Sequence, residues 1–326
     1  MGTLAWEDGL YVSDDGLSLF SFYMPADLIK WVSFVGTHPI CPAVANFIRG
    51  EALTGTDFDL QPPLNNPWGC TDGVLHSEIA VASRPTTADE FSGWKRHSLS
   101  KDFVYDGGFV SSLNGDGTFD LIFSQSTDNN KNDIFWVRES ASLSPALASP
   151  VSLSATINTD AQQDNPHLER LDAKNLVLLF DNHGIGDADT QIRYSVSGDD
   201  GASWSTPKLL SINSDMATED LQGHLFKDSA HNWWLYFSSN RAGQVEIYRA
   251  KHRNNDLIGD FDNWAVVEKV IGVGAVLGDL GVIAAVGEPS LTSNGDLYFV
   301  VVYCKEATEQ TAYDSCDIDP WYAALE

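Results

Sequence analysis

The chain has 326 residues, 43% of them apolar and 11% aromatic, which is enough to bury the core of a large globular domain. Its 19 lysines and arginines against 46 aspartates and glutamates give a formal net charge of −27. Such an excess repels nucleic acid and anionic lipid, so we expect neither as a partner. No stretch approaches the roughly 18 uninterrupted apolar residues that span a bilayer, so we expect no membrane insertion. The carboxylates either solvate the surface or bind calcium or a neutral or cationic substrate.

Three strand-like signals recur in the same order five times along the chain. Each unit opens with a short segment that contains Gly or Pro, at 8–11, 106–109, 164–167, 221–224 and 287–290. An apolar run follows a turn rich in Gly, Asn and Asp, at 19–22, 121–123, 176–180, 234–237 and 297–300. An acid or amide followed by Ile marks a third strand, at 78–79, 133–134, 191–192, 246–247 and 317–318. A fourth strand is often opened by Trp, as at Trp94, Trp204 and Trp264.

This repeat predicts an all-β fold, a single five-bladed β-propeller of four-stranded antiparallel blades that spans residues 1–326. Radial repetition of such blades protects their sheet edges, because the ring closes on itself. The chain ends near the third strand of the last unit, so residues 3–6 are expected to supply its fourth strand. A pair of packed β-sandwich domains is the alternative fold.

Residues 30–72 form a long insertion in the first unit, rich in Pro and carrying Trp31 and Trp68. A long aromatic loop on a regular scaffold predicts a lid or a binding wall over one face of the propeller. Trp68 is placed either to stack on a sugar ring or to pack within the loop.

The four cysteines form two pairs that are close in sequence. Cys41 and Cys70 flank part of the insertion, and Cys304 and Cys316 flank a short loop near the end of the chain. Two local disulfides predict a periplasmic or secreted protein, although no signal peptide is recognisable in the sequence. Free buried thiols are the alternative.

Two stretches resemble known propeller repeats. Residues 235–243, which lead to Glu246-Ile247-Tyr248, resemble the repeat of TolB-type propellers, as do residues 12–16 and 288–295. Residues 197–204, Ser-Gly-Asp-Asp-Gly-Ala-Ser-Trp, resemble the Asp-box hairpin of sialidases. The resemblance implies a propeller fold and a structural role for this hairpin, and it leaves the chemistry open.

Polar residues of the five entry segments converge on one mouth of the central channel. The carboxylates Asp8, Asp106, Asp164 and Glu288 are the predicted catalytic groups, because paired carboxylates serve as acid and base in glycoside hydrolysis. The predicted substrate-binding residues are Asn165, His167, Gln222, His224 and Trp68. The alternative is that these side chains cap strand ends or satisfy backbone amides at turns.

The five-bladed plan is similar to that of glycoside hydrolases of the arabinanase and xylosidase class. That resemblance implies an Asp base in the first blade, matched here by Asp8, and a Glu acid in a later blade, matched by Glu288 or Glu219. The sequence departs from the class in two places. Gly9 follows Asp8 where the class has Pro, and Glu288 lies in the fifth unit, later than expected.

His167 and His224 hold equivalent positions in adjacent units and are predicted to lie side by side. They are the predicted ligands of a metal, either calcium or another divalent ion, and the protein otherwise has no cofactor. The sequence therefore favours a carbohydrate-acting enzyme, most simply a glycoside hydrolase with axial carboxylates. Two alternatives stay open: a non-catalytic propeller that binds a glycan or a protein, and a metal-dependent lyase or hydrolase. The oligomeric state is open.

Overall fold

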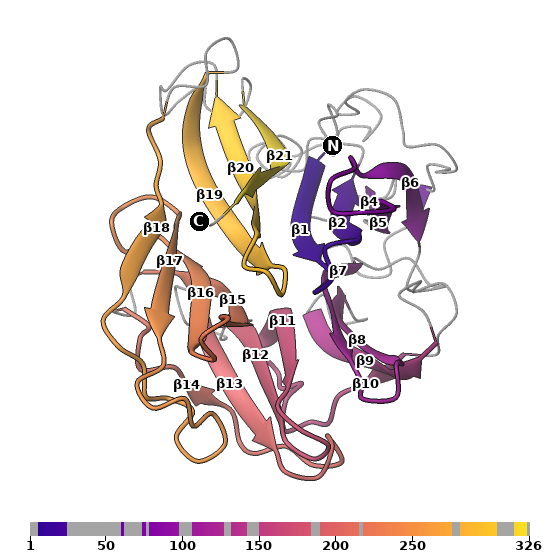
Figure 1. Ribbon diagram of the computed structural model, residues 1–326, viewed down its shortest axis with the longest axis vertical. Helices are drawn as coiled ribbons and strands as arrows, with labels where there is room; N and C mark the ends of the chain where they lie inside the picture. Colours follow the sequence, from indigo (N-terminus) through magenta and orange to yellow (C-terminus); the bar gives the residue numbers. More distant parts are fainter. Residues whose placement is uncertain are drawn as a thin grey trace, which may run out of the picture.

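A computed structural model describes residues 6–24, 60–61, 74–75, 78–97, 106–126, 132–141, 150–183, 190–214, 218–275, 281–304 and 316–324. This part of the chain is all-β: five antiparallel sheets are arranged as blades around a common centre, and a separate two-stranded sheet lies outside them (Figure 1). The prediction of a five-bladed propeller is confirmed. No helix within these ranges is long and apolar enough to cross a membrane.

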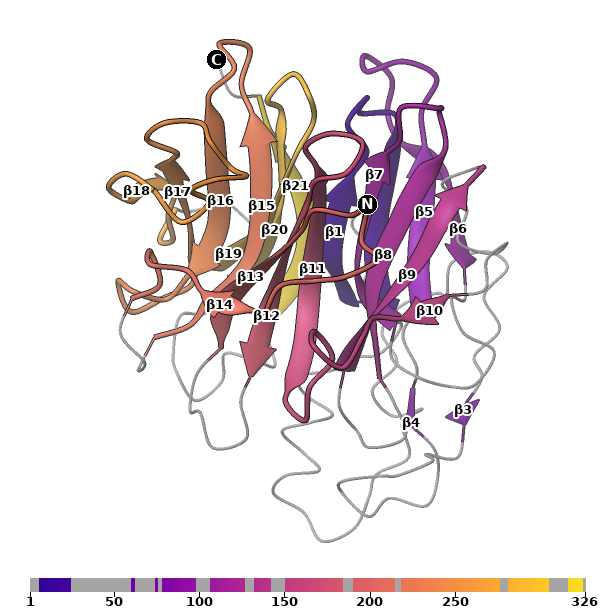
Figure 2. The same ribbon diagram turned by 90° about the horizontal axis from the view of Figure 1, so that it is seen from below.

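The blades follow one another along the chain. Blade one has β1 (Trp6–Val12), β2 (Ser18–Met24), β5 (Glu78–Ser83) and β6 (Ser92–His97), and blade two has β7 (Asp106–Leu113), β8 (Phe119–Ser126), β9 (Asn132–Ser140) and β10 (Val151–Ser152). Blade three has β11 (Gln162–Arg170), β12 (Leu176–His183), β13 (Gln191–Ser197) and β14 (Lys208–Leu209), and blade four has β15 (Asp220–Lys227), β16 (Trp233–Ser239), β17 (Glu246–Lys251) and β18 (Glu268–Ile271). Blade five has β19 (Val282–Leu291), β20 (Leu297–Cys304) and β21 (Cys316–Ala323). The first strand of each blade lies nearest the centre of the ring (Figures 1 and 2).

The middle strands are apolar on both faces because each blade packs between two neighbours. In β12 the run from Leu176 to Phe180 is at most 1% exposed. Leu176, Leu178 and Phe180 pack in a cluster with blade two. Val177 and Leu179 point the other way and pack in a cluster with blade four, as strand alternation requires.

The ring closes through a similar apolar seam. Leu10, Val12 and Leu19 of blade one pack against Tyr298, Val300 and Ile318 of blade five. Trp6 belongs to β1 and pairs with Met24, so the expectation that it extends blade five is wrong at this residue. Residues 3–5 lie outside the described part of the chain. Within the described part, blade five has three strands.

The predicted fourth strands are only partly placed by their tryptophans. Trp94 lies within β6, but Trp204 and Trp264 precede the short strands β14 and β18. Trp204 packs against Trp136 with ring centroids 6.1 Å apart. In the turn before it, Asp199 accepts hydrogen bonds from the Ser203 N–H at 2.8 Å and the Ser203 hydroxyl at 2.6 Å. The Asp199 carboxylate therefore takes the place of a backbone carbonyl as the hydrogen-bond acceptor that holds this turn.

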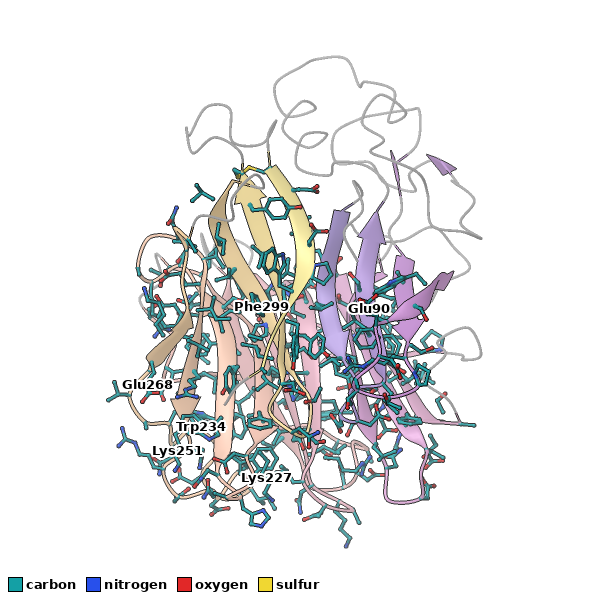
Figure 3. All side chains as sticks on the ribbon, turned by 45° about the horizontal axis from the view of Figure 1, so that its top comes forward. Glu90, Lys227, Trp234, Lys251, Glu268 and Phe299 are labelled. Carbon is teal, nitrogen blue, oxygen red and sulfur yellow. A yellow bond between two sulfur atoms is a disulfide. The ribbon has the colours of Figure 1, made fainter. Side chains whose placement is uncertain are left out.

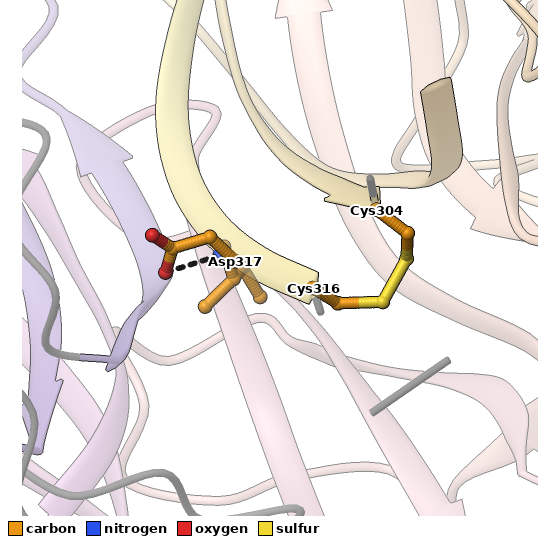
Figure 4. The surroundings of a disulfide bond; sticks show 4 residues. Cys304, Cys316 and Asp317 are labelled. Carbon is orange, nitrogen blue, oxygen red and sulfur yellow. Dashed lines mark hydrogen bonds between the residues drawn. A yellow bond between two sulfur atoms is a disulfide. The ribbon is translucent and has the colours of Figure 1, made fainter. Parts of the chain in front are cut away.

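One disulfide joins Cys304 at the end of β20 to Cys316 at the start of β21 (Figure 4). This confirms the second predicted pair. Cys41, Cys70 and Trp68 lie outside the described residues, as does most of the insertion 30–72. Of the insertion the structure describes β3 (Leu60–Gln61), which pairs with β4 (Val74–Leu75) just beyond it.

Candidate functional site

Every first strand has a bulge at the same place. The register with the second strand shifts between Asp8 and Tyr11 in blade one and at the equivalent points of the other four blades. The residue at the centre of each bulge has a left-handed backbone, with φ of 60°, 52°, 45°, 58° and 56° at Gly9, Gly108, Asn165, Gln222 and Glu288. Glycine adopts this conformation freely, whereas Gln and Glu are strained in it. Such strain is typically retained at functional sites.

The bulges surround a small cavity on the propeller axis. Its volume is about 40 Å³, and residues from all five blades line it, among them Gly9, Gly108, Asn165, Gln222 and Glu288. At Gly108 the neighbouring strand approaches closely, since an added Cβ would lie 2.8 Å from Pro166 Cδ. The axis therefore has room for about one water molecule at this level. A larger ligand would meet the bulges from the channel mouth.

Glu288 is the acidic member of the five bulge residues and is 8% exposed. Its Oε2 accepts the Leu10 N–H at 2.9 Å, and its Oε1 accepts the Gln222 amide at 2.9 Å. The carboxyl also hydrogen-bonds with Asp8 across the seam between blades five and one. Burial, and then the charge of Asp8, raise the pKa of Glu288 well above its ordinary value. Burial and the neighbouring charge therefore both favour the protonated form of this carboxyl.

A belt of hydrogen bonds joins the bulges of blades three, four and five. Gln222 Oε1 accepts the Ser238 hydroxyl at 2.6 Å and the Glu288 N–H at 3.0 Å. Asp181 accepts the Gln222 N–H at 2.9 Å and the Asn165 side-chain amide at 2.8 Å. Burial raises the pKa of Asp181 well above its ordinary range. The belt fixes the orientation of the polar groups at the mouth.

Asp164 lies beside this belt in blade three. It accepts hydrogen bonds from the Ser124 hydroxyl, from the Asn132 amide at 2.8 Å and from the Asn165 N–H at 2.8 Å. Asp106 begins β7, so its backbone has the position expected from the sequence. The side chain of Asp106 lies outside what the structure describes.

His167 and His224 lie side by side, as their equivalent positions predict, with ring centroids 4.5 Å apart. Each Nε2 accepts a backbone N–H from the next blade, that of Leu225 for His167 and that of Leu291 for His224, both at 3.2 Å. Burial lowers the pKa of His167 to about 3 and that of His224 well below its ordinary value, so both rings are neutral. Their visible role is to tie neighbouring first strands together.

The predicted metal at these histidines stays a prediction. Binding through Nε2 would require each ring to give up its backbone hydrogen bond, which leaves Nδ1 as the available ligand atom. Within the described residues no three His, Cys, Asp or Glu side chains form a group that could hold a metal ion.

Sequence reasoning missed Asp181 and Ser238, which orient Gln222 and Glu288. The available signal was position: Asp181 directly follows the apolar run of β12, and Ser238 lies at the same end of β16. An acid placed at the end of a fully buried strand must find partners at that end of the blade. Asn165, Gln222 and Glu288 were predicted, and the structure brings them together.

Glu169 was also missed, and it predicts a pH dependence of stability. It lies on β11, with Oε2 3.7 Å from His167 Nε2, and its side chain is 27% exposed. No ion pair forms, because His167 is neutral. Burial raises the pKa of Glu169 to about 8, while Lys227 opposes the shift. A second carboxyl of the same region, Asp14, has its pKa raised to about 6 by burial and by the charge of Glu169.

The Glu169→Gln variant is therefore expected to be more stable than the parent at about pH 8.5, by about 1–2 kcal/mol after allowance for solvent screening. A carboxyl whose pKa is raised in the folded state favours folding while protonated, so its contribution is lost as pH rises from its ordinary value toward 8. Below about pH 4.5 the two proteins should be equally stable. Urea unfolding at both pH values measures this, with Glu90→Gln as an exposed control on blade one (Figure 3). Equal stability at both pH values would contradict the burial of Glu169.

No protein-family model matches the sequence, and no curated protein matches it either. The TolB-type and Asp-box resemblances therefore stay predictions. Solved structures do match over nearly the whole chain. A thermostable family-43 glycoside hydrolase is 13% identical with a TM-score of 0.56, covering 99% of this chain and 92% of its own.

Two α-L-arabinofuranosidases are similar to the chain in the same way. The family-62 catalytic domain from Coprinopsis cinerea is 8% identical, with a TM-score of 0.59 and coverage of 97% and 93%. The enzyme from Podospora anserina, solved with cellotriose, is 8% identical, with a TM-score of 0.54 and coverage of 98% and 91%. At these identities the likeness is one of fold. The chain thus has the five-bladed propeller that these glycoside hydrolases share, as the sequence predicted.

Proposed function

We propose that this protein is a carbohydrate-acting hydrolase, in its finer form a glycoside hydrolase with acid and base chemistry at Glu288 and Asp8. The observation that carries the proposal is the buried Glu288 carboxyl, hydrogen-bonded to a second carboxyl where all five blades meet, in surroundings that raise its pKa. A carboxyl with a raised pKa is suited to protonate a glycosidic oxygen, and its partner carboxylate is suited to act as base.

The two carboxyls must separate for this chemistry. Retaining glycosidases hold their carboxyl groups about 5–5.5 Å apart and inverting ones about 6.5–9.5 Å, whereas Asp8 and Glu288 are in hydrogen-bonding contact. They belong to different strands, β1 and β19, in different blades. A sugar and a water that enter from the channel mouth would separate the two carboxyls and replace the hydrogen bond between Asp8 and Glu288. Asp164 and Asp106 would orient the sugar or tune the pKa of the pair.

A carbohydrate substrate is supported by the fold and by the amides at the mouth. Structures that share the fold include an arabinofuranosidase solved with cellotriose and a family-62 hydrolase solved with xylotriose. Asn165 and Gln222 line the cavity, and side-chain amides of this kind suit the hydroxyls of a neutral sugar once a ligand replaces their present partners. The disulfide between Cys304 and Cys316 fits a periplasmic or secreted enzyme.

A non-catalytic glycan-binding propeller is the second candidate, and one observation favours it. Gly9, Gly108, Asn165 and Gln222 hold the four bulge positions equivalent to Glu288, and none of them ionises. Because only one of the five bulge residues carries a carboxyl, these residues are better suited to binding a sugar than to cleaving it.

The two candidates differ in turnover. The protein is incubated with arabinans, xylans and their oligosaccharides, with and without EDTA, and new reducing ends and ultraviolet absorbance from unsaturated products are followed. Hydrolysis is expected, with reducing ends rising, no ultraviolet signal and no effect of EDTA. Loss of activity in EDTA would instead support the predicted calcium or other divalent metal, and unsaturated products would support a lyase. Binding without turnover across the panel would sink the hydrolase and leave the binding propeller.

A further inference from the structure

A second cleft lies at the opposite end of the strands from the bulges. In β7 the bulge residue Gly108 is near the start of the strand, whereas this cleft is reached at its end, Leu113. The volume of the cleft is about 410 Å³, within the range of about 300–1,000 Å³ that small-molecule sites occupy. Its walls come from blades two and three and include Asn114, Gly115, Arg138, Glu139, Arg170 and Asp200.

Two arginines in the cleft pair with carboxylates. Arg170 donates to Asp120 at 2.6 Å and to Asp200 at 2.7 Å, and Asp120 is fully buried. Arg138 donates to the other oxygen of Asp200 and lies over the ring of Trp136, 4.8 Å from the centroid. Arg170, which is paired with a fully buried carboxylate, is therefore oriented before any ligand arrives, which lowers the entropy cost of binding.

Two residues that line the cleft each have one buried polar atom with unused hydrogen-bonding capacity. Arg170 Nε is a donor and Asn114 Oδ1 is an acceptor, and neither has a partner within the described residues. Buried polar atoms are normally satisfied, so each orphan calls for an explanation. Both atoms lie behind the surface of the cleft, so the groups that a ligand can reach are the more exposed guanidinium and carboxylate groups of Arg138 and Asp200.

The charges of the cleft restrict the class of ligand. Four carboxylates, those of Asp116, Glu139, Asp172 and Asp200, line it against two guanidinium groups. An anion would meet this excess and the charge of −27 on the whole chain, and a cation would meet the arginines. Hydroxyl groups donate to carboxylates and accept from arginines at once.

We propose that this cleft is a second binding site, for a neutral polyhydroxylated ligand, namely a sugar unit of a glycan. Glu139 adds a backbone strained at φ 54° at the edge of the site, where its N–H is held by Asp120 at 3.1 Å. The site is separate from Asp8 and Glu288. It therefore stands or falls independently of the proposed hydrolase.

Filling the cleft tests the proposal. Gly115 has room for a side chain, because an added Cβ meets nothing within 4 Å and its φ is not left-handed. The Gly115→Trp variant is expected to weaken binding of xylotriose at this site by about tenfold or more, measured by isothermal titration. Ala230→Trp is the matched control, since Ala230 is exposed in the equivalent turn of blade four. It should bind as the parent does.

Three probes separate the outcomes. Xylotriose is expected to bind more tightly than xylitol, because the cleft accepts a ring rather than a free polyol, and glucuronate more weakly than either. Glucuronate binding about tenfold tighter than xylotriose would show an anion site and overturn the proposal, as would no xylotriose binding or equal binding by Gly115→Trp. If that variant does not fold, Arg138→Gln removes the more exposed guanidinium group of the cleft and should weaken binding in the same direction. Hydrolysis of small soluble substrates should be unchanged by Gly115→Trp, which distinguishes this site from the channel mouth.

Discussion

Replacement of Glu288 by Gln is expected to reduce glycan hydrolysis by about 100-fold or more, because the amide cannot donate a proton to a leaving oxygen. The change in melting temperature should be only a few degrees. A protonated carboxyl and an amide have the same shape, and the amide can still donate toward Asp8 and accept from the donors on one side of the group, either Leu10 or Gln222. One lost hydrogen bond costs about 1 kcal/mol. Initial rates and thermal unfolding of the two proteins measure both effects.

Ser238→Ala is the control for this experiment. Ser238 donates to Gln222 and accepts the Glu288 N–H at 2.9 Å, so its loss disturbs the same hydrogen-bonded belt and leaves the carboxyl in place. It should lower stability to a similar degree and retain most of the activity. Equal losses of activity in both variants would show that Glu288 acts through structure. Unfolding of Glu288→Gln would mean that the ring of polar groups is structural, and the site assignment would fail.

Gly201→Ala is expected to destabilise the fold by about 2–4 kcal/mol, because the added methyl group has no space and the backbone is left-handed. Gly201 has φ of 76°, and a Cβ at this position would overlap the indole ring of Trp136. Trp136 is 4% exposed and packs against Trp204, so it has little freedom to move away. Urea unfolding followed by tryptophan fluorescence measures the loss.

Gly117→Ala separates the two causes. Gly117 also has a left-handed backbone, with φ of 87°, but an added Cβ there meets nothing within 4 Å. Its alanine variant should lose about 1 kcal/mol, from backbone strain alone. If Gly201→Ala costs no more than Gly117→Ala, the tight packing of Trp136 against this turn is not as described.

Local signals made most of the fold predictable. The run from Leu176 to Phe180 is apolar whichever way the strand faces, and that pattern identifies a strand buried on both sides. The short strands β14 and β18 lack such a run, so Trp204 and Trp264 were expected to open these strands, whereas they precede them, Trp264 in an isolated bridge with His252.

The candidate site was predictable in position and much less so in chemistry. Equivalent spacing placed His167 beside His224 correctly. Their Nε2 partners are backbone groups of the next blade, at Leu225 and Leu291, and no spacing within one unit reports on those. The strained backbone of Glu288 is equally invisible in the sequence, because contacts from other blades hold it in place.

The seam between blades five and one has a consequence for how this protein can change over time. Glu288 accepts the Leu10 N–H and Ser290 accepts the Val12 N–H, each across 278 residues of chain. The proposed proton donor therefore also helps to close the propeller between blades five and one. The identity of residue 288 is therefore constrained both by the proposed catalysis and by ring closure. Substitutions at this position that strengthen the hydrogen bonds across the seam would tend to remove the acidic proton. Substitutions that make the proton more available would weaken those hydrogen bonds. Stabilising substitutions are therefore expected elsewhere in the propeller. At residue 288, substitutions that abolish catalysis and keep the fold are easier to tolerate than substitutions that improve both.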